Sequence, residues 1–164
     1  MALVHGGQLN KIARQYDIPF DHWLDLSTGI APLSYPVPEI PLSLWQQLPQ
    51  ISDGLIEAAK RYYQCQDVLV TNGSQAIIKS LPALWQAYNP LAKKVYLPER
   101  GYKEHQQAWE KAGYQLYFYQ QALPDVDTLA ENSVLVVINP NNPTGVIFTK
   151  EALNVYQQAL RKLN

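Results

Sequence analysis

The second half of the chain alternates short apolar runs with longer amphipathic stretches. The apolar runs end in turn residues and predict strands over residues 68–70, 94–97, 114–119 and 134–138. The amphipathic stretches predict helices over residues 76–87, 101–112 and 149–162. Pro82 lies inside the first of these helices, and we expect it to bend or split that helix. Strands that alternate with helices predict an α/β fold of three layers, α/β/α, around a mainly parallel sheet.

The first 51 residues do not show this alternation. A short helical pattern through Leu9, Ile12 and Tyr16 precedes a proline-rich segment of residues 32–49. Repeated proline excludes a regular helix or a central strand, yet the segment is too apolar for a disordered tail. We therefore predict an irregular N-terminal arm over residues 1–51 that packs on another surface, such as another subunit. Ser52 is expected to cap a helix that opens the domain of residues 52–164.

Composition excludes several classes of function. The formal net charge of −1 and the scattered basic residues argue against nucleic acid as the main partner. Cys65 is the single cysteine, so no disulfide can form within the chain and no metal site built from several cysteines exists. No apolar run approaches the ~20 residues of a membrane span, and the N-terminus has no signal pattern. We predict a cytoplasmic protein without a metal site.

The segment Asn139-Pro140-Asn141-Asn142-Pro143-Thr144-Gly145 directly follows the apolar run of residues 134–138. Each proline fixes its own φ and biases the preceding residue toward extended backbone. The side chains of Asn139 and Asn142 are therefore expected at the carboxyl end of a strand, where open α/β sheets bind ligands.

Two other predicted strands end in segments with ligand-binding chemistry. After residue 70, the turn Thr71-Asn72-Gly73-Ser74-Gln75 begins a helix, and the N–H groups of Ser74 and Gln75 could bind a phosphate. The alternative is that Ser74 simply caps its own helix. Tyr102 follows the next strand, and its ring could stack on a flat ligand or pack on the helix below it. A ligand with a phosphate, an aromatic ring and a ring hydroxyl would meet all three segments, and pyridoxal phosphate is such a ligand.

The order of these segments resembles the large domain of fold-type I pyridoxal-phosphate enzymes, the aspartate aminotransferase superfamily. Residues 139–145 match the N-P-x-N-P-T-G motif of that superfamily. The resemblance implies that Asn142 binds the ring hydroxyl of pyridoxal 5'-phosphate and that Tyr102 stacks on the ring. It also implies that Gly73, Ser74 and Gln75 hold the phosphate.

The N-terminal arm resembles the cobalamin-pathway members of the superfamily, the threonine-phosphate decarboxylases. The similarity includes His5-Gly6-Gly7, residues 26–30, and the run Gly101-Tyr102-Lys103-Glu104-His105. It implies decarboxylation of L-threonine O-3-phosphate to (R)-1-amino-2-propanol O-2-phosphate. The arm residues that would contribute to the substrate site are His5, Gly7, Ser27 and Gly29.

The resemblance covers only the front part of a family member. The Schiff-base lysine, the aspartate that faces the pyridine nitrogen and the substrate-binding arginine of the family would lie beyond residue 164. We therefore expect this segment alone to be inactive and to contain no catalytic residue of its own. An aminotransferase of the histidinol-phosphate type and a non-catalytic truncated remnant are the alternatives. The apolar arm and an unfinished sheet edge predict a homodimer or a higher oligomer.

Overall fold

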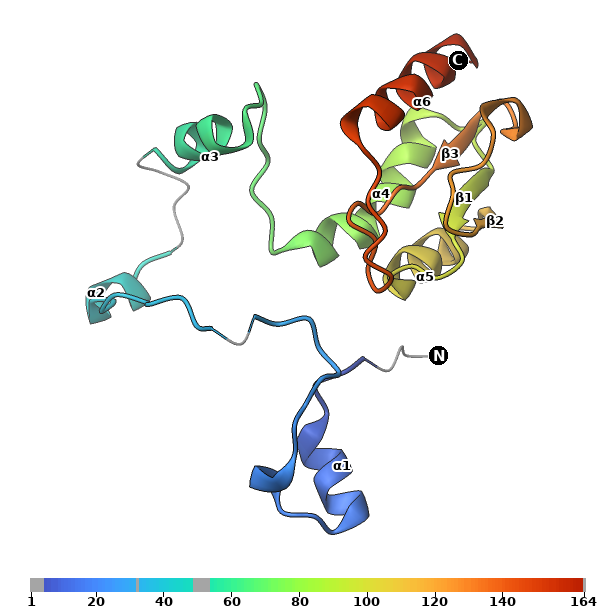
Figure 1. Cartoon of the computed structure of the whole chain (residues 1–164). Helices are drawn as coiled ribbons and strands as arrows, with labels where there is room; N and C mark the ends of the chain where they lie inside the picture. Colours follow the sequence, from blue (N-terminus) through green and yellow to red (C-terminus); the bar gives the residue numbers. More distant parts are fainter. Residues whose placement is uncertain (1–4, 32, 49–53, 164) are drawn as a thin grey trace. The chain divides into compact units, whose positions relative to one another are not determined.

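The computed structural model describes residues 5–31, 33–48 and 54–163 (Figure 1). The chain forms two compact units, Met1–Leu69 and Val70–Asn164, and each is described by itself. The predicted boundary after residue 51 remains a prediction. No helix among the described residues is long and apolar enough to cross a membrane.

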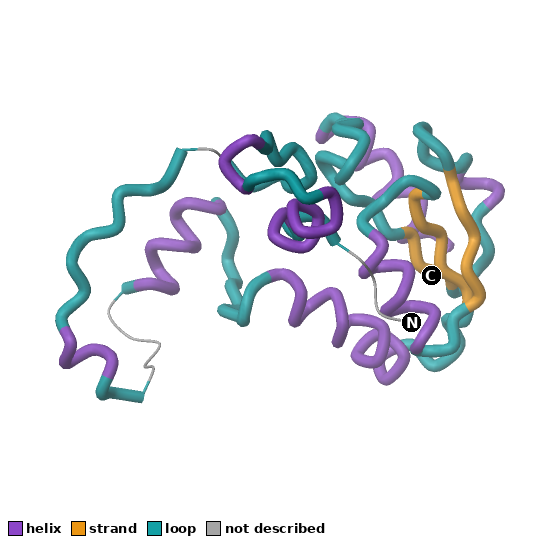
Figure 2. The backbone as a smooth tube through the Cα atoms, turned by 90° about the horizontal axis from the view of Figure 1, so that it is seen from below, coloured by secondary structure: helices purple, strands orange, loops and turns teal. Residues whose placement is uncertain are grey.

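A parallel sheet of three strands organises the second unit. Its strands are β1 (Lys94–Pro98), β2 (Gln115–Tyr119) and β3 (Ser133–Leu135). The strands lie side by side (Figure 2). Their order is β2-β1-β3, and Tyr96 is paired with Tyr117 on one side and with Leu135 on the other. Because the three strands run in the same direction, their carboxyl ends lie at the same edge of the sheet. The predicted parallel α/β fold is confirmed.

Helices α4 (Ser74–Tyr88) and α5 (Lys103–Lys111) pack on each other, and the main core lies between α5 and the sheet. Val95 and Leu97 point from β1 into this core and are 0% and 1% exposed. Trp109 of α5, also 1% exposed, packs edge-on against Tyr114, with ring centroids 4.7 Å apart. Burial of these side chains fixes α5 over the sheet and so sets the position of the residues that precede α5.

The opposite face of the sheet carries Tyr96, since successive side chains of a strand point to opposite faces. Its ring stacks on Tyr117 with centroids 5.2 Å apart, and its hydroxyl accepts a hydrogen bond from the N–H of Ala130 at 3.2 Å. The short 3₁₀ helix η2 (Val126–Thr128) lies beside Tyr96, and α6 (Lys150–Leu163) packs on η2. The second unit therefore has layers on both faces of the sheet.

Several sequence predictions for residues 68–138 need correction. Residues 68–70 form no strand, because no described segment pairs with them and a strand without a partner has no ladder of hydrogen bonds. The last predicted strand ends at Leu135, although the N–H of Val136 still donates to the carbonyl of Tyr96 at 2.9 Å. The helix predicted from Gly101 begins at Lys103. Pro82 is buried within α4 and does not split it.

The first unit contains short helices joined by irregular chain. These are α1 (Leu9–Tyr16), η1 (Phe20–His22), α2 (Leu42–Trp45) and α3 (Leu55–Tyr63). The helix predicted through Leu9 and Tyr16 is confirmed, whereas the cap predicted at Ser52 lies outside the described residues. Large apolar side chains of the arm are exposed, among them Leu33 at 86% and Trp45 at 72%. An exposed apolar surface of this kind is typical of a segment that packs against another protein surface.

Candidate cofactor site

The turn before α4 leaves the N-terminus of that helix without a capping side chain. Gly73 occupies the cap position with φ +73°, and Ser74 is the first helical residue. No side chain among the described residues caps α4, so the alternative that Ser74 caps its own helix is wrong. The reason is that the left-handed Gly73 takes the cap position and shifts Ser74 into the helix. The N–H groups of the first turn therefore lack a capping side chain and suit an anion.

Tyr102 connects the start of α5 with the start of α4. It is the extended cap residue of α5, and its carbonyl accepts a hydrogen bond from the N–H of His105 at 3.1 Å. The half-buried side chain reaches the first turn of α4, where its hydroxyl donates to Oε1 of Gln75 at 3.5 Å. The predicted stacking residue and the predicted phosphate turn therefore lie next to each other.

A backbone pairing brings the asparagine loop to the same place. Gly101 forms an isolated antiparallel bridge with Pro143. Gly101 directly precedes Tyr102 and Pro143 directly follows Asn142, so the bridge brings the two segments that contain these residues side by side. Asn142 is exposed. The structure therefore brings Gln75 into contact with Tyr102 and brings the loop of Asn142 beside the residue before Tyr102, while Gly73 and Ser74 directly precede Gln75.

The other two asparagines of the loop have structural roles. Asn139 Nδ2 donates to the carbonyl of Phe148 at 3.0 Å, and its Oδ1 accepts the N–H of Phe148 at 2.9 Å. Asn141 is buried, and its Nδ2 donates to the carbonyl of Arg100 at 2.8 Å and to Oγ1 of Thr144 at 2.6 Å. These bonds close the loop and attach it to the turn before Tyr102. The sequence analysis did not identify Asn141 as important. Three asparagines in one short loop were nevertheless a signal that some of them would hold the loop by hydrogen bonds.

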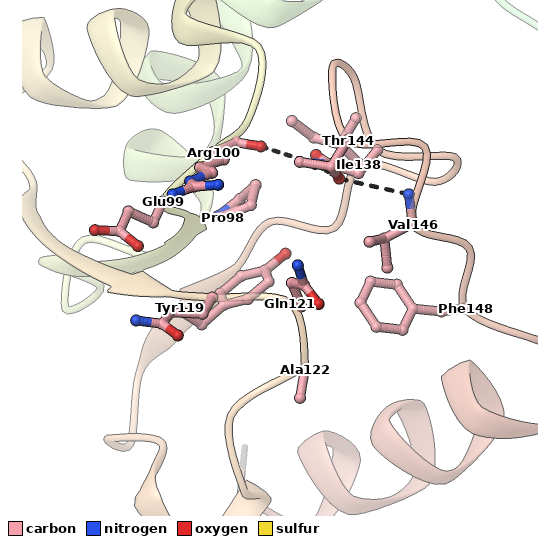
Figure 3. A pocket seen from close by; sticks show the side chains of 12 residues that line it. Pro98, Glu99, Arg100, Tyr119, Gln121, Ala122, Ile138, Thr144, Val146 and Phe148 are labelled. Carbon is pink, nitrogen blue, oxygen red and sulfur yellow. Dashed lines mark hydrogen bonds between the residues drawn. The ribbon is translucent and has the colours of Figure 1, made fainter.

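A cavity of about 400 Å³ lies beside these residues at the carboxyl edge of the sheet (Figure 3). It is lined by the ends of β1 and β2 and by the loop after β3, and the rings of Tyr119 and Phe148 form part of its wall. Tyr119 donates its hydroxyl to the carbonyl of Val136 at 2.8 Å, and burial raises the pKa of that hydroxyl to about 12. None of the five predicted cofactor residues lines this cavity. The predicted site is thus an open edge next to the cavity and not the cavity itself.

The arm residues predicted to contact the substrate all lie in the first unit. The N–H of Gly7 donates to Oγ of Ser27 at 2.9 Å, and Ser27 Oγ donates to Oδ1 of Asp25 at 2.6 Å. The side-chain and backbone hydrogen bonds from Ser27 lower the pKa of Asp25. Two of the four predicted residues, Gly7 and Ser27, are therefore in direct contact. His5 comes two residues before Gly7, whereas Gly29 is exposed and has nothing within 4 Å of the position its Cβ would take.

Residues 47–162 match the family described as aminotransferase class I and II. The chain belongs to this family. The match includes the turn before α4, Tyr102 and the asparagine loop. The family assignment therefore agrees with the resemblance seen in the sequence, and it covers the residues that the fold brings together.

Single relatives of this aminotransferase-family chain have names that are more specific than the family description. It is 42% identical over 162 residues to a threonine-phosphate decarboxylase of Pseudomonas aeruginosa, covering 98% of this chain and 46% of the relative. It is 38% identical over 148 residues to a threonine-phosphate decarboxylase of a Sinorhizobium species, covering 87% and 42%. A probable aminotransferase of Arabidopsis thaliana is 34% identical over 112 residues, covering 61% and 24%. The chain spans about half the length of the two decarboxylases that it matches.

Proposed function

We propose that the protein is a pyridoxal-phosphate enzyme that decarboxylates L-threonine O-3-phosphate to (R)-1-amino-2-propanol O-2-phosphate in cobalamin biosynthesis. The observation that carries the proposal is the 42% identity to a threonine-phosphate decarboxylase over 98% of the chain. The cofactor is supported by membership of the class I and II aminotransferase family, whose enzymes use pyridoxal phosphate.

The residues at the sheet edge fit this cofactor. The uncapped N-terminus of α4 and the Ser74 hydroxyl supply donors for a phosphate. The half-buried ring of Tyr102 is an aromatic surface next to them, and the exposed Asn142 belongs to the loop that pairs with Gly101, the residue before Tyr102. Donors for a dianion, an aromatic surface and an amide for a ring hydroxyl are the three groups that a phosphorylated hydroxypyridine requires.

In this proposal the chain binds and orients, and it supplies no proton-transfer group. When bound, pyridoxal phosphate withdraws electrons from the bond that breaks as carbon dioxide leaves. Ser74 and the first N–H groups of α4 hold the phosphate, and Tyr102 excludes water from one face of the ring. Asn142 donates its amide to the ring hydroxyl and fixes the rotation of the ring. These contacts convert binding energy into orientation of the reacting bond.

The arm is proposed to contribute to the substrate end of the site through His5, Gly7, Ser27 and Gly29. The contact of Gly7 with Ser27 supports a built loop at this place. Gly6 supports it further, because a Cβ there would lie 1.8 Å from the carbonyl oxygen of Ser27 and only glycine fits. The N–H of Gly7 and the hydroxyl of Ser27 donate to Ser27 Oγ and Asp25 Oδ1, so a bound substrate would have to replace these partners.

Amino transfer is the second candidate reaction. The family description and the Arabidopsis relative both favour it, because each is named for aminotransferase activity. The two reactions share the cofactor site and differ in the bond that breaks, so the residues at the sheet edge do not separate them.

An assay of the protein at its native length separates the two reactions. With pyridoxal phosphate and L-threonine O-3-phosphate, we expect carbon dioxide and aminopropanol phosphate in equal amounts. Amino transfer from histidinol phosphate to 2-oxoglutarate, without release of carbon dioxide, would replace the decarboxylase proposal with the aminotransferase.

We also propose a homodimer and a cytoplasmic location. The dimer is supported by the exposed apolar side chains of the arm, such as Leu33 and Trp45. Sedimentation equilibrium at micromolar concentration is expected to give twice the mass of one chain, and a monomer at every concentration would remove this part of the proposal.

A further inference from the structure

The backbone and the side chain of Gln75 point to different parts of the candidate site. Its N–H belongs to the first turn of α4, which is the proposed phosphate site. Its side chain is instead directed to Tyr102, whose hydroxyl donates to Gln75 Oε1 at 3.5 Å. Gln75 is partly buried, so the amide has limited room to turn away from that hydroxyl.

The Tyr102 ring is supported on a second side by His105. The two rings lie edge to face, with centroids 6.4 Å apart and an interplanar angle of 78°. Burial lowers the pKa of His105, which favours the neutral imidazole next to the ring. His105 fixes the edge of the ring, whereas the hydrogen bond to Gln75 fixes the hydroxyl end. The tilt of a ring held at two points is determined much more closely than that of a ring held at one.

We propose that Gln75 is a positioning residue whose side chain holds Tyr102 in its stacking orientation, while the backbone of the same turn holds the phosphate. This inference rests on the proposed cofactor site and assigns the two parts of Gln75 to different partners. The separation of 3.5 Å is longer than that of an ordinary O–H···O hydrogen bond, and we expect it to shorten when a ring stacks on Tyr102.

A double-mutant cycle on the protein at its native length tests this inference. The variants are Gln75→Ala, Tyr102→Phe and the double variant, and the readout is the Kd for pyridoxal phosphate from the absorbance of the bound cofactor. Loss of one neutral hydrogen bond costs about 0.5–1.5 kcal/mol, so each single variant should bind about 2- to 12-fold more weakly. Both substitutions remove the same hydrogen bond. The Kd of the double variant for pyridoxal phosphate should therefore be no higher than that of the single variant with the higher Kd.

Inorganic phosphate is the second probe, and Gln86→Ala on the same helix is the matched control. Gln75→Ala should leave the affinity for inorganic phosphate unchanged, since the phosphate meets backbone N–H groups. Gln86→Ala should change neither Kd. Fold-losses that multiply in the double variant, or a matching loss of phosphate affinity in Gln75→Ala, would overturn the inference and leave the cofactor site intact. Absence of pyridoxal-phosphate binding by the unmodified protein would overturn both.

Discussion

Replacing Gly101 with alanine is expected to lower the free energy of unfolding by about 1–3 kcal/mol, the usual cost of overpacking. A Cβ on Gly101 would lie 2.5 Å from Cγ of Pro98 and 3.1 Å from Cδ1 of Ile138. The contact with Pro98 decides the cost, because its ring is rigid and buried, whereas the Ile138 side chain can shift by a few tenths of an ångström. Urea denaturation followed by circular dichroism measures this loss.

The same substitution should also weaken cofactor binding. Gly101, which precedes Tyr102, pairs with Pro143, which follows Asn142. Moving the two segments apart separates the stacking ring from the amide, and we expect the Kd for pyridoxal phosphate to rise at least about tenfold, or ~1.4 kcal/mol. Titration with pyridoxal phosphate, without denaturant and at the pH where the protein is most stable, measures this change in Kd.

Gly113→Ala is the matched control for both effects. Gly113 follows α5 with φ +81° and has nothing within 4 Å of the position its Cβ would take. An alanine there meets only the left-handed backbone penalty of about 1–2 kcal/mol. It should therefore destabilise the fold to a similar degree and leave cofactor affinity unchanged. Equal losses of affinity in the two variants would show that stability, and not the Gly101–Pro143 pairing, controls binding.

Ser74→Ala is expected to raise the Kd for pyridoxal phosphate about tenfold to a hundredfold. A hydrogen bond to a charged group contributes about 1.5–3 kcal/mol, and the hydroxyl of Ser74 is proposed to donate to the phosphate dianion. Pyridoxal, which has no phosphate, should bind both proteins equally. Competition titrations with the two ligands separate the phosphate contact from a general loss of the site.

The control for Ser74→Ala comes from the same helix. The hydroxyl of Ser80 donates to the carbonyl of Ala76 at 2.7 Å, within α4 and away from its N-terminus. Ser80→Ala removes the same atom and should leave both affinities unchanged. A Ser74→Ala protein that retains full affinity for pyridoxal phosphate would exclude the proposed phosphate contact.

The hydrophobic pattern of the sequence predicted the strands and helices of the second unit where the signal lies within the segment itself. The runs that became β1 and β2 were visible because Val95 and Leu97 alternate with Tyr96 and because a turn follows each strand. Residues 68–70 have a similar composition and form no strand. Pairing is a property of two segments, so an apolar run predicts a strand only where a partner exists.

The ligand chemistry of the candidate site stays a prediction, and the sequence analysis missed the residues that support that site. The residue types of Ser74, Tyr102 and Asn142 predicted a ligand, and their positions after predicted strands predicted a common sheet edge, although residues 68–70 before Ser74 form no strand. The roles of Gly101 and Asn141 depend on an approach between segments about forty residues apart, for which a single sequence has no local signal. No local pattern in the sequence predicts that Asn141 is buried while its neighbour Asn142 is exposed.

The location of bound pyridoxal phosphate tests the convergence of Ser74, Tyr102 and Asn142 most directly. A crystal structure of the protein with the cofactor is expected to show the phosphate at the first turn of α4, the ring on Tyr102 and the ring hydroxyl at the amide of Asn142. Cofactor bound instead in the cavity beside Tyr119 and Phe148, out of reach of those three side chains, would contradict the account.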